Sequence, residues 1–390
     1  ADKNQNKMKI LFVCENYHPF YGGAETLFKN LAEGFSKKGH QVSVLTHRLK
    51  NTPKKESINQ VEVQRVSSAG SRYVFTFSSL FQAIRMAGKH DLIQTTTFNG
   101  AFPAWLAGKI TGKPVVLTVH EVWVGKWRSV TGFSGIKCTI HDLLERMLYL
   151  FPFYRYVCVS ESTQKDLLRR GIAPEKVNVI YNGLDYGFWD PKKVKKYEIG
   201  KVQEELGLRD KYVFFCWGRP GNSKGFEYAI RAFPLVVKEK KDAMLLLMLS
   251  SASSYRQKYR ELAGLVKEIN RKTGSENIKM VPSSGKEELR ALLRAVDCVV
   301  VPSLAEGFGF STIEAAAMGK PVIASDAGSL PEVVSGKHLF FSSKNHLDLA
   351  EKMASALRDK FNISSARRFE WNYCIEKYIA AYSRLKTGLK

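Results

Sequence analysis

Two successive series of short apolar runs, separated by helical patterns, constrain the fold of this chain more than any other feature of its sequence. Most runs are continuously apolar, which is typical of strands covered on both faces in a parallel sheet. The stretches between them are amphipathic; in residues 24–39 apolar side chains recur at helical spacing, and Gly39 follows as a stop signal. Two such series imply two doubly wound α/β domains. The expected strands are residues 9–14, 41–46, 61–66, 91–97, 114–121, 155–160 and 177–181 in the first series, and 212–217, 243–249, 277–281, 297–301, 321–325 and 338–342 in the second.

A polar, lysine-rich segment marks the boundary between the two domains. Residues 188–205 contain a proline and four lysines within five positions, which is typical of an exposed linker. We place the hinge near 183–195, which gives an N-terminal domain of residues 1–185 and a C-terminal domain of residues 195–370. A last helical pattern, about residues 371–387, is long enough to pack back on the first domain.

The chain is strongly basic, with 60 Lys and Arg residues against 37 Asp and Glu residues and a formal net charge of +23. Such an excess indicates a polyanionic partner, which can be nucleic acid, an anionic membrane surface or a phosphorylated small molecule. No nucleic acid partner is expected, because the sequence has no aromatic RNA-binding pattern, no helix-turn-helix and no helix with clustered Lys and Arg.

The six cysteines and the length of the apolar runs indicate a cytoplasmic protein. No cysteine belongs to a CxxC pair or stands at metal-binding spacing from histidine, so buried packing thiols are expected rather than a zinc site or disulfides. No apolar run approaches the roughly 20 residues that span a bilayer. Residues 9–14 are too short for a signal-peptide core.

The loop after the strand at 212–217 has the composition of a phosphate site. Ligands of open parallel sheets bind beyond the carboxyl ends of the strands, and here the sequence is GRPGNSKGFEYAI, residues 218–230. Arg219 and Lys224 flank a turn that opens a helix. Two cations, helix-end amides and flexible glycines such as Gly218 make a pyrophosphate cradle. The GxxxxGK[ST] spacing is absent, which argues against a P-loop ATPase.

A glycine pair follows the first strand. Gly22 and Gly23 stand just before the helix of residues 24–39, where glycines let backbone amides approach an anion or a sugar closely. A tight turn that binds nothing explains the pair equally well.

The most specific segment is VPSLAEGFGFSTIEAAAMGKPVIAS, residues 301–325. It consists of a strand end, a glycine-bearing loop and an alanine-rich helix that begins near Phe310. Glu314, inside the helix, can be explained as a partner of the helix dipole. That explanation does not cover Glu306, which lies among the glycines of the loop. Carboxylates accept hydrogen bonds from vicinal hydroxyls, so two such groups suit a sugar and a ribose.

The span from Glu306 to Glu314 resembles the E-x7-E signature of the retaining nucleotide-sugar glycosyltransferases of family 4. Other landmarks follow in the order of that family, and the resemblance covers residues 8 to 335. They are GGAE at 22–25, TVHE ending at 121, VSES at 159–162, YNGLD at 181–185 and the GR…KG pattern at 218–225. The resemblance implies the GT-B architecture, in which two Rossmann-like domains face a central cleft and the second domain holds most of the donor.

The resemblance also implies roles for residues of the second domain. Arg219 and Lys224 would neutralise the diphosphate of the donor as the sugar–phosphate bond breaks. Glu306 would hold hydroxyls of the transferred sugar, and Glu314 would hold the ribose. Backbone amides after Glu306 would line the sugar and phosphates, namely those of Gly307, Phe308 and Gly309.

In the first domain the resemblance implies two further contacts. His120 would touch the sugar near the reacting carbon, although a lone histidine after a strand is often a packing residue. Gly22 and Gly23 would close the phosphate side.

No metal and no other cofactor is expected. The sequence has no Asp-x-Asp metal clamp at the end of a strand, and two cations can compensate the charge of a diphosphate in place of a metal. The base of the nucleotide is not decodable, although residues 281–288 and 250–253 are the candidate recognition segments. Guanine, uracil and adenine stay open, with GDP- or UDP-hexose as the favoured donors.

The leading hypothesis is therefore a retaining, metal-independent hexosyltransferase acting on an acceptor hydroxyl. The alternatives are a nucleotide-sugar epimerase or a sugar-phosphate synthase on the same fold, and a basic nucleic-acid-binding protein. Acceptor profiling separates the first two from the leading hypothesis, and a gel shift with random DNA and RNA tests the last.

The first domain suggests what the acceptor is. Residues 1–150 hold 20 basic and 10 acidic residues, and residues 71–89 and 122–156 mix bulky apolar side chains with cations. In the second of these segments Trp127 stands between Lys126 and Arg128. Aromatic rings and cations together suit the headgroup layer of a membrane, although packing under the sheet would also explain the rings. We expect peripheral binding to anionic bilayers and a lipid-linked or membrane-proximal acceptor glycan.

Overall fold

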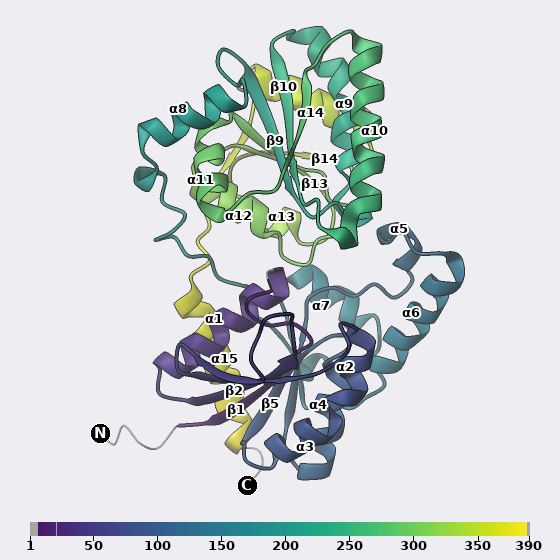
Figure 1. The fold of residues 1–390 in the computed structure, drawn as a ribbon, viewed down its shortest axis with the longest axis vertical. Helices are drawn as coiled ribbons and strands as arrows, with labels where there is room; N and C mark the ends of the chain where they lie inside the picture. The colour runs from purple at the N-terminus through teal and green to yellow at the C-terminus, as the bar shows by residue number, and fades with distance from the viewer. Residues whose placement is uncertain (1–6, 21, 388–390) are drawn as a thin grey trace. The chain divides into compact units, whose positions relative to one another are not determined.

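The computed structural model describes residues 7–20 and 22–387, and these fall into two compact units (Figure 1). Unit 1 takes in the described residues of Ala1–Val124, Ile140–Gly183 and Phe369–Lys390. Unit 2 consists of Gly125–Thr139 and Leu184–Arg368. Each unit has its own sheet, covered by helices on both faces.

Unit 1 contains an eight-stranded sheet with the order β3-β4-β2-β1-β5-β6-β7-β8. Every neighbouring pair is parallel except β3 and β4. The strands are β1 (Lys9–Val13), β2 (Gln41–His47), β3 (Lys55–Ile58), β4 (Val61–Val66), β5 (Leu92–Thr96), β6 (Val115–Val119), β7 (Arg155–Cys158) and β8 (Val177–Val179). The helices are α1 (Gly23–Lys37), α2 (Arg72–Ser78), α3 (Leu80–Ala87), α4 (Ala101–Thr111), α7 (Glu161–Leu168), the short η1 (Pro174–Lys176) and α15 (Trp371–Thr387), and α6 (Gly135–Leu148) crosses from unit 2 into unit 1.

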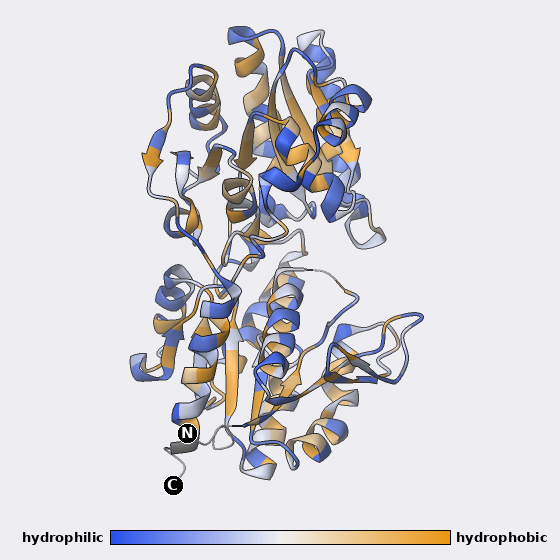
Figure 2. Ribbon diagram, turned by 90° about the vertical axis from the view of Figure 1, so that its left-hand side faces the viewer, coloured by the Kyte–Doolittle hydropathy of each residue, from blue (hydrophilic) through white to orange (hydrophobic). Residues whose placement is uncertain are grey.

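The two faces of this sheet carry different helices because side chains alternate along each strand. Leu11 and Val13 of β1 belong to the core that α2, α3, α4, α6 and α7 cover. Phe12 lies between them in sequence and packs on the other face, where its ring meets those of Phe28 and Phe35 of α1. Figure 2 shows strands that are mostly hydrophobic beside helices that mix hydrophobic and hydrophilic residues.

The last helix, α15, belongs to unit 1 although the chain reaches it only after completing unit 2. Two buried hydrogen bonds tie it to the sheet. The hydroxyl of Tyr382 donates to Oε1 of Gln94 at 2.6 Å, and the hydroxyls of Tyr378 and Thr118 lie 3.0 Å apart. The first strand, β1, and the last helix, α15, therefore belong to one unit, as the length of the 371–387 pattern allowed.

Unit 2 contains a seven-stranded sheet with the order β11-β10-β9-β12-β13-β14-β15, parallel except for the last pair. The strands are β9 (Tyr212–Gly218), β10 (Ala243–Leu249), β11 (Ile278–Pro282), β12 (Cys298–Val301), β13 (Val322–Ser325), β14 (Gly336–Phe341) and β15 (Asn362–Ser364). The helices are α5 (Trp127–Val130), α8 (Lys196–Glu205), α9 (Phe226–Glu239), α10 (Arg256–Thr273), α11 (Lys286–Ala295), α12 (Phe310–Ala317), α13 (Leu330–Val333) and α14 (His346–Leu357), with the short η2 (Pro191–Lys193), η3 (Asn222–Lys224) and η4 (Ser253–Tyr255).

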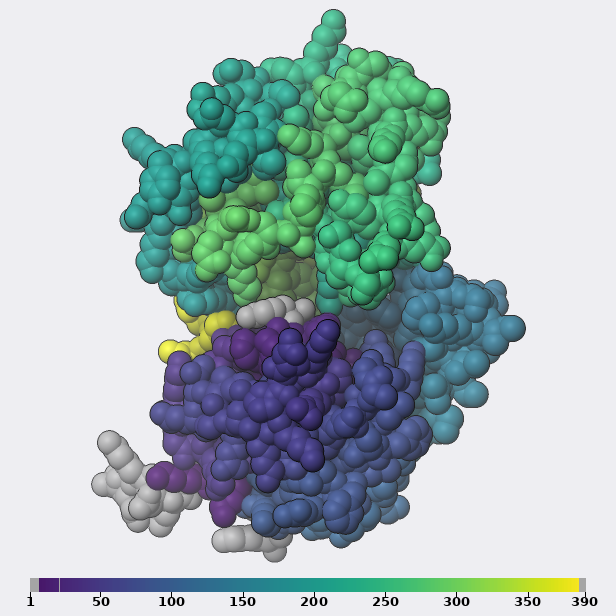
Figure 3. All heavy atoms as spheres, in the orientation of Figure 1, coloured from purple at the N-terminus to yellow at the C-terminus, as the bar shows by residue number. Residues whose placement is uncertain are grey.

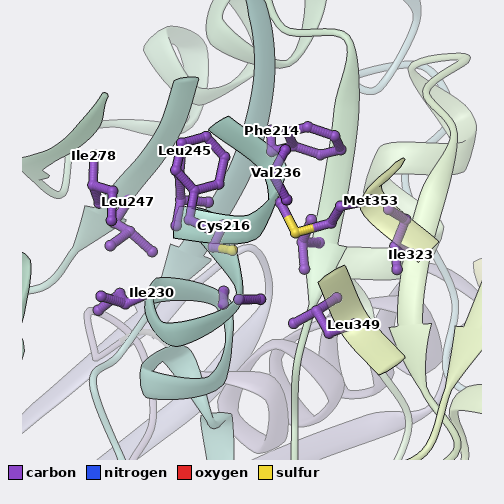
Figure 4. Close-up of a cluster of buried hydrophobic side chains, with 14 of the residues drawn as sticks. Phe214, Cys216, Ile230, Val236, Leu245, Leu247, Ile278, Ile323, Leu349 and Met353 are labelled. Carbon is purple, nitrogen blue, oxygen red and sulfur yellow. The ribbon is translucent and has the colours of Figure 1, made fainter. Parts of the chain in front are cut away.

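The core of unit 2 lies between this sheet and helices α9, α10 and α14. Figure 4 shows Phe214 and Cys216 of β9 on the same side as Leu245 and Leu247 of β10, since alternate residues of neighbouring strands share a face. Met353 of α14 closes this layer. The six cysteines of the chain are all buried and free, as expected for packing thiols.

The strand predictions correspond to thirteen of the fifteen strands, and the two that were missed have a common cause. β3 and β15 are three or four residues long, lie at sheet edges and pair antiparallel. All three residues of β15 are exposed, and β3 reads KESI, so neither shows the apolar run that marks the central strands.

Two boundaries also differ from the sequence interpretation. The lysine-rich segment predicted as linker is helical over Lys196–Glu205, where α8 packs on α11. The division into 1–185 and 195–370 placed residues 125–139 in the first domain, whereas they belong to unit 2. In unit 2 the segment packs against the loop after β9; a Cβ atom on Gly132 would lie 3.2 Å from the Asn222 amide nitrogen.

Candidate donor-binding site

The candidate site of unit 2 lies where the order of its strands reverses. In the sheet of unit 2, β9 is the first strand in sequence, and β10 and β11 follow on one side of it. The next strand, β12, lies on the other side of β9. Cys298 and Val299 of β12 pair with Phe214 and Phe215 of β9 in parallel register. The loops that leave the carboxyl ends of these two strands therefore diverge at the position where doubly wound sheets bind ligands.

The loop after β9 is shaped by a glycine that no other residue can replace without strain. Gly225 has a φ of 61° and forms the N-cap of α9. A Cβ atom there would lie 2.1 Å from the carbonyl oxygen of Pro302, at the end of β12. The backbone N–H of Leu304 donates to the carbonyl of Ser223 at 2.6 Å. The two loops are thus joined backbone to backbone.

Glu306 and Lys224 meet across this junction. The Lys224 ammonium lies 2.6 Å from Oε2 of Glu306, and the hydroxyl of Ser303 donates to the same oxygen at 3.0 Å. The Glu306 side chain is 13% exposed. Its backbone carbonyl accepts hydrogen bonds from the N–H and the hydroxyl of Ser329, each at 3.0 Å. Both the side chain and the backbone of this residue are therefore held in place.

Gly328 allows that close backbone contact. Its φ is 59°, and a Cβ atom there would lie 2.3 Å from the carbonyl oxygen of Glu306. Larger residues would push the segment after β13 away from the Glu306 loop.

Arg219 is the second cation predicted for this site. It follows β9 directly, its side chain is exposed, and no ion pair or hydrogen bond of its guanidinium is found in the described part of the chain. Gly218 before it has a φ of 140°. The Arg219 guanidinium is thus open to solvent on the loop that also carries Lys224.

The segment after Glu306 leads into α12. Gly307, Phe308 and Gly309 are buried, and the ring of Phe308 packs edge-on against that of Phe310 at 5.3 Å. Gly309, with a φ of 92°, is the N-cap of α12. The free N–H groups of the helix start therefore follow directly after the Glu306 loop.

Glu314 lies half-buried in α12. Loss of contact with water raises the pKa of its carboxyl to about 8, and the nearby Lys286 lowers it in part. No hydrogen bond of this carboxyl is found among the residues that the structure describes. At neutral pH a large fraction of Glu314 is protonated.

The predicted residues of unit 1 lie at the carboxyl edge of its sheet. Gly22 is the N-cap of α1 and Gly23 its first residue, so the pair stands at the helix start as expected. His120 directly follows β6, and its ring packs edge-on against Phe28 at 6.0 Å. Burial lowers the pKa of His120 to about 4, so the imidazole is neutral near pH 7. Its Nε2 has no hydrogen-bond partner within the described residues.

Sequence reasoning missed several polar residues near these loops. Ser303 and Ser329 bind Glu306, but serines in loops carry no distinctive signal. In unit 1, Glu15 follows β1 and pairs with Arg72 at 3.0 Å, and burial raises the pKa of the Glu15 carboxyl. Its place directly after an apolar strand is a signal that could have identified it.

No group of three or more His, Cys, Asp or Glu side chains able to hold a metal ion occurs among the described residues. Within that same part of the chain, no helix is long and apolar enough to cross a membrane.

Two family models match the chain in tandem and together cover most of it. The model described as Glycosyltransferase Family 4 matches residues 21–188, and that described as Glycosyl transferases group 1 matches residues 199–373. The second match contains the whole Lys224–Glu306 site. The chain belongs to the family 4 glycosyltransferases. It is a glycosyltransferase of the GT-B type.

Relatives of this glycosyltransferase match most of its length. An uncharacterised glycosyltransferase of Methanocaldococcus jannaschii is 29% identical over 340 residues, which are 84% of this chain and 83% of that protein. A D-inositol 3-phosphate glycosyltransferase of Segniliparus rotundus is 24% identical over 398 residues, 94% of this chain and 85% of that protein. The crystal structure of the Anabaena protein HepE in complex with UDP and glucose has a TM-score of 0.77 and 20% identity, and covers 97% of this chain and 100% of that one. The likeness to HepE concerns the fold.

Proposed function

We propose that this glycosyltransferase moves a hexose from a nucleotide diphosphate sugar to an acceptor hydroxyl with retention of anomeric configuration and without a metal ion. The observation that carries the proposal is the contact between Lys224 and Glu306 at the strand-order reversal of unit 2. The contact supports the proposal because a cation suited to phosphate lies beside a carboxylate suited to sugar hydroxyls.

Charge compensation is the first task of such a site. The bond between the anomeric carbon and the phosphate oxygen breaks, and negative charge grows on the departing diphosphate. Lys224 is fixed by its loop, and Arg219 on the same loop is free to turn toward the phosphates. Preorganised cations that face developing charge lower the barrier by several kcal/mol, typically about 3–4 kcal/mol for each donor. These two side chains supply the positive charge that a metal provides elsewhere.

Sugar and ribose recognition is the second task. Glu306 is held by Lys224, Ser303 and Ser329, so its second carboxylate oxygen can accept from sugar hydroxyls without a loss of side-chain freedom. The N–H groups from Gly307 to Gly309 and the start of α12 suit the phosphates. Glu314, further along α12, is assigned to the ribose hydroxyls.

Unit 1 is assigned the acceptor and the remaining contacts with the donor. His120 is neutral, so its contribution is a hydrogen bond to the sugar and not a positive charge. Gly22 and Gly23 offer the first N–H groups of α1 to the phosphate side. Retention, metal independence and these roles are supported by the resemblance of the Glu306–Glu314 segment to the family signature.

UDP- or GDP-hexose is the proposed donor class, and a lipid-linked or membrane-proximal glycan is the proposed acceptor. HepE binds UDP and glucose, which favours testing uridine donors first. The acceptor of the Segniliparus relative is D-inositol 3-phosphate, so soluble polyol phosphates are the competing acceptor class.

The test is a donor and acceptor panel with purified protein. Thermal shift with UDP-, GDP- and ADP-sugars identifies the donor, and product release is then measured with lipid-linked sugars, inositol phosphates and hexose phosphates. Transfer to a hexose phosphate only would support the sugar-phosphate synthase alternative. Interconversion of the donor sugar without an acceptor would support an epimerase.

Charge-removing variants test the mechanism. Lys224→Ala and Arg219→Ala are each expected to lower kcat by about 100- to 1,000-fold, because each removes a positive charge that compensates the charge of the leaving diphosphate. Lys241→Ala, which changes an exposed lysine elsewhere in unit 2, is the matched control. Activity of the wild type that disappears on addition of a chelator would contradict the metal-free mechanism.

A further inference from the structure

Unit 1 exposes an unusually large set of bulky apolar side chains on helices α2, α3 and α6. On α2 and α3 they include Phe77 and Phe81, which are 70% and 76% exposed. On α6 and just after it they include Leu143, Leu144 and Leu150, and Leu150 is 79% exposed. We call this set the apolar surface; its members are Tyr73, Val74, Phe77, Phe81, Ile140, Leu143, Leu144, Met147 and Leu150. Bulky apolar side chains that are exposed in number on one side of a protein indicate an interaction site.

The spacing on α6 shows that the outward residues form a stripe. Leu143 and Leu144 each lie three or four residues from both Ile140 and Met147, the spacing of one helix face. The opposite face of α6 is already buried, because Leu148 and Tyr149, at the end of the helix, lie in the core of unit 1. α6 therefore carries a second apolar face that the folding of unit 1 does not use. Figure 3 shows α6 at the molecular surface, in blue-teal at the right.

α2 lies beside α6 in unit 1. The hydroxyl of Tyr73 is 2.9 Å from Nε2 of His141, and the two rings meet edge-on with centroids 6.0 Å apart. Phe75 points the other way and is completely buried, which fixes the roll of α2. Figure 1 likewise shows α2 next to α6 and above α3. The apolar residues of the three helices thus lie on one side of unit 1.

The chain around this surface is basic, and its acidic groups are engaged. Within unit 1, residues 71–124 and 140–156 hold seven Lys or Arg residues and four Asp or Glu residues. Glu145 is buried, where it accepts from the N–H of Trp123. Asp142 pairs with Arg146 at 2.7 Å, and Asp91 accepts from the N–H of Lys9. Arg85 of α3 and Lys89 just after it are exposed, with no ion pair found in the described part of the chain.

We propose that the apolar surface of α2, α3 and α6 is a docking surface for an anionic lipid bilayer. Apolar side chains enter the boundary between headgroups and acyl chains, and the basic residues around them meet the lipid phosphates. A second copy of this chain fits less well, because a twofold contact would bring two basic rims together. The docking is peripheral, and it does not depend on the sugar transfer proposed above.

The structure also corrects which residues make this contact. The ring of Trp127 was expected in the headgroup layer but is buried, as is that of Phe153 in the same 122–156 segment. Aliphatic residues of α6 and the two phenylalanines of α2 and α3 take their place. Substitution of Trp127 would therefore report on folding and not on membrane binding.

Vesicle co-sedimentation of the full chain tests the proposal. The probes are vesicles of phosphatidylcholine alone and of phosphatidylcholine with phosphatidylglycerol, each at low and high salt. The wild type is expected to pellet with the anionic vesicles at low salt and to be released by high salt. Phe81→Ser/Leu144→Ser is expected to weaken binding by roughly tenfold or more, and Arg85→Glu/Lys89→Glu to remove the salt-sensitive part.

Matched controls separate docking from stability and from catalysis. Ile363→Ser removes an apolar side chain of unit 2 that is 78% exposed and is expected to bind vesicles like the wild type. All variants are expected to keep the wild-type Tm and the rate of transfer to a water-soluble acceptor. Wild type that ignores anionic vesicles at low salt would overturn the proposal. So would light scattering that shows a wild-type dimer and a monomeric Phe81→Ser/Leu144→Ser variant, because the surface would then be a self-association interface.

Discussion

Lys224 and Glu306 are 82 residues apart in the sequence and 2.6 Å apart in space. The sequence predicted both residues, because each stands in a glycine-bearing loop that follows an apolar strand. It could not predict their contact, because the contact requires β12 to lie beside β9 in the sheet. The order of the strands depends on packing throughout unit 2. The hydrogen bonds that the N–H and the hydroxyl of Ser329 donate to the Glu306 carbonyl escaped prediction for the same reason.

Glu306→Gln tests whether this carboxylate acts on the sugar. Glutamine can still present a carbonyl oxygen to Lys224 and Ser303, so we expect a wild-type fold and nearly unchanged affinity for the nucleotide. Turnover is expected to fall by about 100-fold or more, because an amide accepts more weakly from sugar hydroxyls than a carboxylate does. Steady-state kinetics and isothermal titration with the nucleoside diphosphate measure the two effects. Loss of Tm or of nucleotide binding would show instead that Glu306 has a structural role; Glu287→Gln, at the exposed start of α11, is the control.

Glu314 gives a pH dependence whose sign follows from its raised pKa. The folded value of about 8 lies above the ordinary value of 4.5, so between these pH values the folded chain binds more protons than the unfolded chain. The contribution of Glu314 to the free energy of unfolding is therefore fully present below pH 4.5 and is lost as pH rises toward 8. We therefore expect Glu314→Gln to gain Tm relative to wild type as pH rises from about 5 to about 8. A Tm difference that stays constant over this range would contradict the burial argument.

Nucleotide binding is expected to show the opposite trend if Glu314 accepts from ribose hydroxyls. Hydroxyl donors favour the ionised carboxylate, so affinity should rise with pH, approaching tenfold per pH unit, and level off above about pH 8. Titration calorimetry of wild type and Glu314→Gln measures this, and the variant is expected to show no such rise.

At the scale of elements, apolar runs located the central strands, and polar edge strands escaped detection. The pattern at about 371–387 predicted α15, described over Trp371–Thr387, because its helical spacing is uninterrupted. What the pattern could not show is the pair of hydrogen bonds that join α15 to β5 and β6. Those bonds depend on Gln94 and Thr118, and the sequence does not show which polar side chain of a strand bonds to a distant helix.

Tyr382→Phe tests how α15 is held. The change leaves Oε1 of the buried Gln94 without its donor, which is expected to cost about 1–3 kcal/mol in the free energy of unfolding. Urea denaturation followed by circular dichroism measures the loss. Tyr373→Phe, on the exposed side of the same helix, is expected to change stability by less than about 0.5 kcal/mol. Equal effects of the two changes would mean that the Tyr382 bond does not anchor the helix.

At the scale of the whole molecule, two series of strands predicted two units, and the assignment of 125–139 was wrong. Composition could not reveal it, because the segment is contiguous in sequence with unit 1 and joins unit 2 only through packing. The sequence showed that segments 71–89 and 122–156 are rich in both apolar and basic residues. It could not show which of their aromatic rings are buried, because burial depends on packing in the core of unit 1.

The division of labour between the units can be tested by hydrogen exchange of the full chain. A nucleoside diphosphate is expected to protect residues 218–226 and 303–316 of unit 2, because these segments hold Lys224, Glu306 and Glu314. The complete nucleotide sugar is expected to extend protection to residues 22–26 and to the segment around His120 in unit 1. β3 and α3, which carry none of the assigned contacts, serve as internal controls and should exchange at unchanged rates. Protection by the nucleoside diphosphate that is confined to unit 1 would reverse the assignment of the donor site.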